Sequence, residues 1–156
     1  YYSLGYWGLT YGSSNAPIDP GSAGGIMSYG DALGGNGGGA IRIEAVNTVT
    51  INGSVMASGQ AAFLWYGGGS GGGIYIRCRI FDGDTNGSLR ADGGAGGGYG
   101  GGGGGGRIAV WRVKDKTDGD VAVSVSATGG GSGTPPSPGT IVYVVLPGDG
   151  SVFLVR

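Results

Sequence analysis

Histidine is absent from this sequence of 156 residues, and cysteine occurs once, at Cys78. The missing histidine removes histidine-based catalytic triads, most zinc sites and the commonest general base. A single cysteine cannot form an internal disulfide. Charged residues make up only 12% of the chain, and the net charge of −1 leaves no basic surface for nucleic acid or for an anionic membrane. We therefore expect a protein that is not an enzyme, with no metal, no other cofactor and no nucleic-acid partner.

Long apolar runs and strong helix formers are also scarce. No stretch approaches the ~20 apolar residues of a transmembrane helix, so we expect no membrane insertion. With one Glu, two Lys and one Gln, the sequence predicts almost no helix. Glycine is abundant instead, at 42 residues, which is about four times its usual share of roughly 7%. The apolar residues form short alternating runs that disordered segments lack.

Each glycine tract ends abruptly in a strand-like run. The pattern occurs in GGNGGGAIRIEA (34–45), GGGSGGGIYIRC (67–78) and GGGGGGRIAVW (101–111). The runs begin at Ile41, Ile74, Ile108 and Ile141, at a nearly constant repeat interval of roughly 33 residues. A second strand-like run follows each of them, as in NGSVMASG (52–59) and NGSLRADGG (86–94). The sequence therefore predicts a repeated unit of strand, polar turn, strand and glycine tract.

This interval favours an all-β fold, namely a β-solenoid or β-helix-like stack of coils of about 33 residues with polyglycine-type segments. We expect a single domain over residues 1–156, with a lead-in or cap at 1–39 and repeats at about 40–73, 74–106, 107–139 and 140–156. A β-sandwich of hairpins is the alternative, because VNT (46–48) and DGDTNG (82–87) are compatible with hairpin turns. The first residue is Tyr1, so we expect a processed mature chain or a piece of a longer protein.

The alternation of each strand predicts which side chains face inward. We expect Ile43, Ile76 and Val110 to be buried and stacked on one another, with Cys78 on the same face as a small buried residue. The opposite face places Glu44 over Arg77 and Arg77 beside Trp111. Arg112 falls on the inward face, which predicts a bulge or an early strand end near Trp111.

The glycine tracts raise a question of hydrogen bonding. A tract such as GGAGGGYGGGGGGG (93–106) has few side chains, but every residue carries an amide and a carbonyl that need partners. Since the tracts recur once per unit, we expect them to lie side by side as extended threefold strands bonded to one another. Solvated flexible loops are the alternative.

Few residues suggest chemistry. Most acidic residues lie beside glycine in turns such as DGDTNG and TDGD, where Asp stabilises the turn; a calcium site and a pair of catalytic carboxylates are the alternatives. None of the glycine tracts has the lysine and helix of a phosphate-binding loop. Asn52 and Asn86 both begin Asn-Gly-Ser, which is an N-glycosylation acceptor and also a favoured tight turn. We expect both to be exposed on one edge.

GGGSGGGIYIRC, NGSLRADGG and GGGGGGRIAVW together resemble a glycine-rich repeat region of large secreted and cell-surface proteins of protists and bacteria. YGSSNAPIDPGSAGG (11–25) is similar to the lead-in of that region. The resemblance spans residue 11 to about residue 155 and implies an extracellular or cell-surface location, with little about activity. A looser similarity is to the glycine-rich tips of phage tail-fibre adhesins, which stack polyglycine strands but lack the regular aliphatic strands seen here.

We expect an extracellular structural protein, a self-assembling building block of a surface filament or appendage that forms a head-to-tail homopolymer. The expected contact residues lie at the two ends of the chain: Tyr1, Tyr2, Tyr6, Trp7, Tyr11, Val152, Phe153, Leu154 and Val155. A carbohydrate- or receptor-binding adhesin module is the alternative. In that case exposed aromatics, including Phe63, Trp65 and Tyr66, would stack on glycans.

Overall fold

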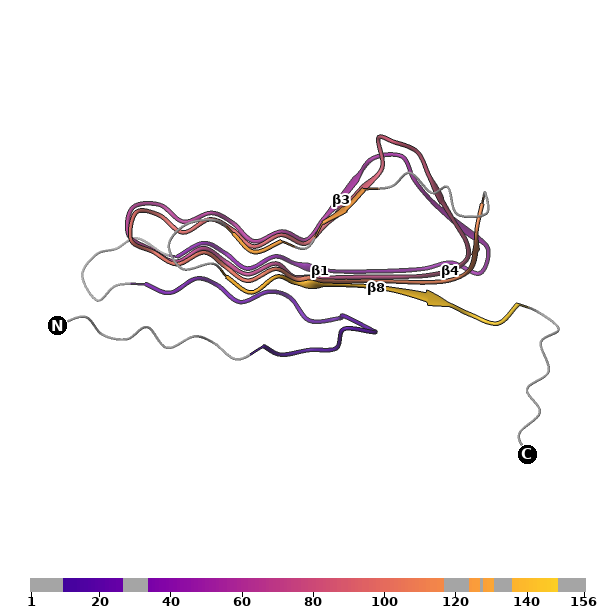
Figure 1. Cartoon of the computed structure of the whole chain (residues 1–156), viewed down its shortest axis with the longest axis horizontal. Helices are drawn as coiled ribbons and strands as arrows, with labels where there is room; N and C mark the ends of the chain where they lie inside the picture. The colour runs from indigo at the N-terminus through magenta and orange to yellow at the C-terminus, as the bar shows by residue number, and fades with distance from the viewer. Residues whose placement is uncertain (1–9, 27–33, 117–123, 127, 131–135, 149–156) are drawn as a thin grey trace, which may run out of the picture.

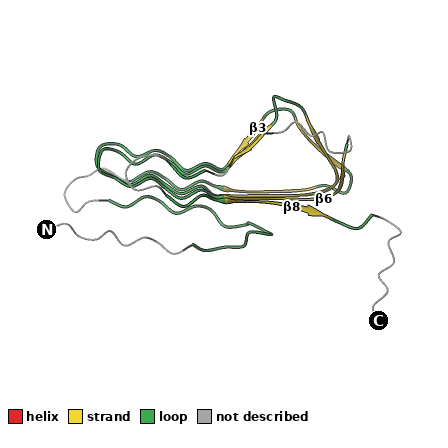
Figure 2. Ribbon diagram, in the orientation of Figure 1, coloured by secondary structure: helices red, strands yellow, loops and turns green. Residues whose placement is uncertain are grey.

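The structure is a computed structural model, and it describes residues 10–26, 34–116, 124–126, 128–130 and 136–148. This part of the chain is all-β and contains no helix (Figure 2). Strands gather at one end of an elongated molecule, and two layers of glycine-rich chain extend from them as an arm (Figure 1). The strands are β1 (Ala40–Glu44), β2 (Thr48–Ile51), β3 (Ser54–Met56), β4 (Gly73–Gly83), β5 (Ser88–Arg90), β6 (Arg107–Asp115), β7 (Ser124–Ser126) and β8 (Thr140–Val145).

The strands form two sheets in which every described pair is parallel. One sheet has the order β1-β4-β6-β8, with β2 also paired to β4, and the other has the order β3-β5-β7. Hairpins would require antiparallel neighbours. Because β1 and β2 both pair with β4, the VNT segment between them is not a hairpin turn. The described pairings therefore do not support the alternative of a sandwich of hairpins.

The register between strands is the one that the sequence predicts. Ile41 lies opposite Ile74, Ile74 opposite Ile108, and Ile108 opposite Ile141. In the second sheet the residues paired across β3, β5 and β7 include Val55, Leu89 and Val125. Parallel strands cannot be joined by a tight turn, so the long connections between partners follow from this arrangement.

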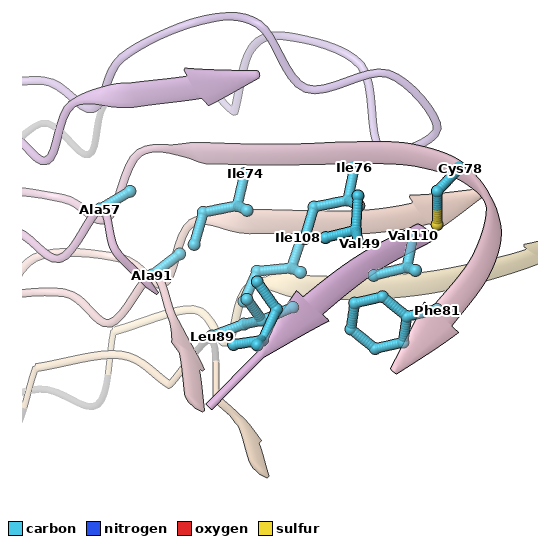
Figure 3. Close-up of a cluster of buried hydrophobic side chains, with 11 residues drawn as sticks. Val49, Ala57, Ile74, Ile76, Cys78, Phe81, Leu89, Ala91, Ile108 and Val110 are labelled. Carbon is cyan, nitrogen blue, oxygen red and sulfur yellow. The ribbon is translucent and has the colours of Figure 1, made fainter. Parts of the chain in front are cut away.

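The core lies between the two sheets. Ile76 and Val110 are completely buried, as expected, but Ile43 is only partly buried because β1 is an edge strand that packs against the core from one side. Cys78 lies among these apolar side chains, at the same end of the cluster as Val110 and Phe81 (Figure 3). Its burial is confirmed, and burial raises the pKa of its thiol.

The expected break near Trp111 is wrong. β6 runs on to Asp115, and Arg112 stays in register between Cys78 and Val145. The guanidinium of Arg112 is accommodated because it donates to both carboxylate oxygens of Asp115 and lies 5.0 Å from the centre of the Tyr143 ring. An inward-facing charge therefore continues the strand when a carboxylate further along the same strand neutralises it.

The irregularity lies earlier in the chain. Between β1 and β2 the segment 45–47 lies opposite only Cys78 and Arg79 of β4. The extra residue is characteristic of a β-bulge, and Val46 at its centre is almost fully exposed. Nothing in the sequence indicated this bulge, because Ala45 continues the alternation.

The outer face of the larger sheet is covered by the lead-in. The Trp111 indole donates to the carbonyl oxygen of Asn15 at 2.6 Å, and Pro17 is buried. Tyr75 and Ala109 are buried on the same face. Figure 1 shows the lead-in (indigo) running along one side of the sheet and the arm. The face opposite the core, on which the sequence places Arg77 and Trp111, is therefore largely an interface within the chain.

The expected charge pairs on that face also differ. Glu44 and Arg77 are opposite one another in register, as are Arg77 and Trp111. However, Glu44 pairs with Arg42 on its own strand at 3.0 Å, and Arg42 lies 5.5 Å from the centre of the Tyr75 ring. Register fixes which backbones are adjacent, but long flexible side chains reach past the residue directly opposite.

The arm is held together by backbone hydrogen bonds between glycine-rich segments. In segment 67–72 successive amides donate in three directions in turn, and the pattern repeats every third residue. The acceptors are the carbonyls of Gly25, Gly101, Gln60, Ser22, Gly104 and Ala57, for residues 67 to 72 in order. A period of three is that of the polyproline II helix. The prediction that glycine tracts bond to one another is confirmed by these bonds.

This packing leaves no room for most side chains. A Cβ on Gly68 would collide with the carbonyl oxygen of Gly94, and a Cβ on Gly71 with that of Ala91. By contrast, nothing lies within 4 Å of a Cβ built on Gly39. Glycine is therefore required only at positions that face a neighbouring segment, and side chains such as that of Ser70 occupy the positions between.

The Gly71→Ala variant should be destabilised by roughly 1–3 kcal/mol or more, because its methyl group must displace backbone atoms on an adjacent segment. Gly39→Ala is the matched control and should be neutral or slightly stabilising, since alanine lowers the entropy of the unfolded chain. Urea unfolding followed by circular dichroism measures both. Equal stability of the two variants would contradict the close packing of the arm.

Candidate functional site

The two layers of the arm are joined at its far end by reverse turns. Residues 63–66 form one turn, closed by a bond from the Tyr66 amide to the Phe63 carbonyl at 3.3 Å. Residues 97–100 form the other, closed by a bond from the Gly100 amide to the Gly97 carbonyl at 2.6 Å. The two turns are offset along the chain by the same interval as β4 and β6 behind them. We call these two turns the arm tip.

Both turns need a positive φ at their second residue. The values are 53° at Leu64 and 45° at Gly98. Glycine adopts this conformation freely, whereas a bulky residue does so at a cost of about 1–2 kcal/mol. Strained residues of this kind persist where the surrounding structure holds them and are frequent at binding sites. The backbone conformation of Leu64 therefore makes the arm tip a candidate functional site.

The arm tip carries large exposed aromatic side chains. The Trp65 and Tyr99 rings stack with centroids 5.0 Å apart and planes inclined by 14°. Phe63 is 75% exposed and Tyr99 is 88% exposed, whereas Tyr66 is buried at the base of the turn. The aromatic cluster suggested by the sequence is thus partly right: Phe63 and Trp65 are surface residues and Tyr66 is not. Tyr99 was missed, although it lies one repeat interval after Trp65.

The chemistry of the arm tip is apolar and uncharged. Residues 60–66 and 95–100 include no Asp, Glu, Lys or Arg. Contiguous exposed apolar side chains on a soluble protein mark interaction surfaces. Flat aromatic faces with a polar indole or phenol group suit ligands that combine apolar faces with hydroxyl groups. The arm tip is therefore an exposed aromatic surface without charged side chains.

The two glycosylation acceptors lie next to one another. Asn52 and Asn86 are both exposed, as expected. Their serines, Ser54 and Ser88, are paired in register, and the Ser88 hydroxyl donates to that of Ser54 at 2.8 Å. This edge joins the two sheets and is separated from the arm tip by the whole length of the arm. The expected alignment of the two asparagines on one edge is confirmed.

The predicted end contacts are mostly outside the described residues. Tyr11 is described, and its hydroxyl donates to the carbonyl of Pro20 at 2.7 Å within the lead-in. The others lie in segments that the structure does not describe: Tyr1, Tyr2, Tyr6, Trp7, Val152, Phe153, Leu154 and Val155.

Among the described residues, Asp84 behaves as the sequence predicts for an acid in a turn, and Asp92 is an exception. The Asp84 carboxylate accepts from the Asn86 amide at 2.8 Å, which stabilises the turn. The exception is Asp92, which is 8% exposed and links neighbouring segments. Its amide donates to the Ser58 hydroxyl, and its carboxylate accepts from Arg90, Ser126 and Thr128. By the register of β3, β5 and β7, Ser58, Asp92 and Thr128 occupy the same place in three successive repeats, so Asp92 joins all three.

Two opposing effects set the pKa of Asp92. Burial alone would raise it, but hydrogen bonds from Ser126, Thr128 and Arg90 lower the pKa to about 2. The carboxylate therefore remains ionised at all ordinary pH values. Its role is structural, because every oxygen is already engaged by donors from within the chain.

The described residues include no group of three or more Cys, Asp or Glu side chains that could hold a metal ion. In the same ranges there is no helix long and apolar enough to cross a membrane. No protein-family model, curated protein or solved structure matches this chain.

Asp92 should make stability depend on pH in a defined window. Its pKa is lower in the folded than in the unfolded chain, so its stabilising contribution is present above about pH 4 and is lost as the pH falls towards 2. The contribution is about 2 kcal/mol, because a pKa difference of one corresponds to ~1.4 kcal/mol. The free energies of unfolding of wild type and Asp92→Asn, measured in urea, should therefore differ most at about pH 5 and become equal near pH 2. A difference in free energy that stays constant between about pH 5 and about pH 2 would show that the hydrogen bonds do not favour the ionised carboxylate.

Proposed function

We propose that this protein is an extracellular structural building block that assembles head to tail into a filament or surface appendage. We also propose that successive repeats wind as coils of a β-solenoid. In each coil the glycine tract forms the long third side. Parallel pairing of each strand with the equivalent strand of the next repeat supports that winding. The resemblance to glycine-rich repeat regions of secreted and cell-surface proteins supports the location.

One observation carries the assembly proposal: the last strand of the larger sheet is an apolar edge. β8 pairs with β6 on one side and is the final strand in the sheet order. Ile141 pairs with Ile108, and Tyr143 pairs with Val110. Ile108 and Val110 are completely buried, whereas Ile141 and Tyr143 are exposed and Val145 is 69% exposed. Natural edge strands are normally protected by charge, proline or a bulge, and the TIVYVV run of β8 has none of them.

The opposite edge of the sheet is chemically different. β1 carries Arg42 and Glu44 on its exposed face, and the bulge at residues 45–47 follows it. Two unlike edges make a heterologous contact, which produces rings or open filaments. The aromatic segment with Tyr1, Tyr2, Tyr6 and Trp7 and the C-terminal Val152, Phe153, Leu154 and Val155 remain the proposed end contacts.

Val145→Lys should abolish polymers while leaving the folded monomer intact, because it places a charge on the exposed edge without entering the core. Phe63→Lys is the control, since Phe63 is an exposed apolar residue at the arm tip, away from both edges of the sheet. Sedimentation velocity and negative-stain electron microscopy give the readout. Polymers of unchanged length from Val145→Lys would refute β8 as the joint.

A second candidate function, a carbohydrate-binding adhesin module, is favoured by the arm tip. The stacked Trp65 and Tyr99 rings belong to the two turns at the end of the hydrogen-bonded arm. Figure 1 shows that this arm extends away from the strands. An uncharged aromatic surface in that position suits the apolar face of a neutral sugar ring. The two functions are compatible, because the arm tip and β8 are different surfaces.

Trp65→Ala and Tyr99→Ala should each weaken glycan binding at least tenfold if the arm tip is the binding surface. Met56→Ala is the control, because Met56 is another exposed apolar residue, on β3, away from the arm tip. A neutral-glycan array probed with the three variants and the wild type provides the measurement. Wild-type signal at background level would leave the structural function standing and remove the adhesin.

A further inference from the structure

The lead-in shows how the arm binds an additional extended segment. Residues 21–25 lie antiparallel on the face formed by segments 34–39 and 67–72. Four backbone bonds of 2.7–3.0 Å hold them: Gly21 and Gly24 donate to the carbonyls of Gly38 and Gly35, and Gly67 and Ser70 donate to those of Gly25 and Ser22. The face therefore offers two carbonyls from one segment and two amides from the next.

The same set of groups recurs one segment further along the arm. The carbonyls of Gly68 and Gly71 are equivalent, one repeat interval later, to those of Gly35 and Gly38. In the same way, the amides of Gly101 and Gly104 are equivalent to those of Gly67 and Ser70. No hydrogen bond within the described part of the chain uses any of these four groups. We call the surface formed by segments 67–72 and 101–106 the second glycine face.

The second glycine face also has space for a backbone. A Cβ built on Gly67 would come within 2.9 Å of the Gly25 amide, because the lead-in lies there. At the equivalent position, Gly101, a Cβ meets nothing within 4 Å, and at Gly104 the nearest atom is the Ser137 carbonyl oxygen at 3.7 Å. The second face thus presents the same donors and acceptors as the first, without a segment of the described chain against them.

The first face defines what the second can accept. A Cβ on Gly21 or Gly24 would collide with the carbonyl oxygens of Ser70 or Gly67, whereas Ser22 and Ala23 carry side chains without hindrance. The rule is glycine at every third position of an extended, threefold backbone. Because both partners advance by about 3.1 Å per residue, the glycines of the guest, three residues apart, donate to carbonyls of the face that are also three residues apart.

We propose that the second glycine face binds a Gly-x-x-Gly segment, and that its occupant is Gly5-Tyr6-Trp7-Gly8 of a second molecule of this protein. This tetrapeptide has the glycine spacing of Gly21 and Gly24 and lies in residues 1–9, which contain no charged side chain. Four neutral backbone bonds suit a guest without charge. The identity of the occupant rests on the proposed head-to-tail assembly, whereas the site itself rests on the four unused backbone groups.

The test uses the full chain at a concentration at which it is monomeric and a fluorescent peptide of residues 1–10. Fluorescence anisotropy should show saturable binding to the wild type and at least tenfold weaker binding to Gly101→Leu, whose side chain fills the face. Gly39→Leu is the control, because its side chain also enters open space but on another segment. Melting temperatures of the two variants should agree, which excludes misfolding as the cause.

The peptide provides a second, independent comparison. Gly8→Ala in the peptide should weaken binding at least tenfold, because its methyl group would meet a carbonyl oxygen, whereas Leu9→Ala should bind as the unmodified peptide does. The proposal is overturned if the wild type does not bind the peptide, if Gly101→Leu binds it equally well, or if Gly8→Ala has no effect.

Failure of this proposal can be told apart from failure of the assembly proposal. Polymers that form normally from Gly101→Leu, together with absent peptide binding to the wild type, would reject the second glycine face and leave the β8 joint intact. Peptide binding that obeys the glycine rule in a protein that never polymerises would support the face and reject the filament.

Discussion

The arm depends on one constraint: every backbone amide and carbonyl removed from water needs a partner, and glycine segments have no side chains to provide one. In segment 67–72 the amides are satisfied by segments on three sides, so no segment could be ordered alone. Each segment is ordered because the others are, and the large entropy lost by fixing glycine is offset collectively. The strands contribute by delivering every tract at the same place, since the common register of β1, β4, β6 and β8 sets where each tract ends.

The same constraint explains why the tracts are not pure glycine. Positions that lie against the backbone of a neighbouring segment admit no Cβ, whereas the positions between them carry Asn36, Ser70 or Asp92. These side chains bring polar groups into the arm. Asp92 uses such a position to join three successive repeats, because its amide donates to the Ser58 hydroxyl and its carboxylate accepts from Ser126 and Thr128. A tract that reads as low complexity therefore encodes a threefold pattern of contacts.

Much of the strand arrangement could be predicted from the sequence, because the regular spacing of Ile41, Ile74, Ile108 and Ile141 identifies the equivalent strands and their register. The misses share a physical cause. Arg112 reads as a misplaced charge until Asp115 is placed beside it, and the burial of Tyr75 under the lead-in depends on a contact between segments far apart in the chain. For the arm tip, Phe63 and Trp65 were found by composition, whereas Tyr99 needed the repeat offset to be applied to an isolated residue in a glycine tract. Repetition is readable from one sequence, but contacts that occur once in the fold are not.

A lattice of backbone bonds differs from a side-chain core in how it ends. A core closes when its apolar surface is covered, but a glycine segment at the margin presents the same amides and carbonyls as one in the interior. The lead-in covers the first such margin, and the groups on Gly68, Gly71, Gly101 and Gly104 repeat it without a cover from the described chain. β8 presents the corresponding situation in the sheet, where Tyr143 continues a ladder beyond its last buried member. Both margins arise because the last repeat exposes the same groups that the interior repeats use to bind their neighbours. Under the proposed assembly, further segments would add at the residues that lie where the repetition stops.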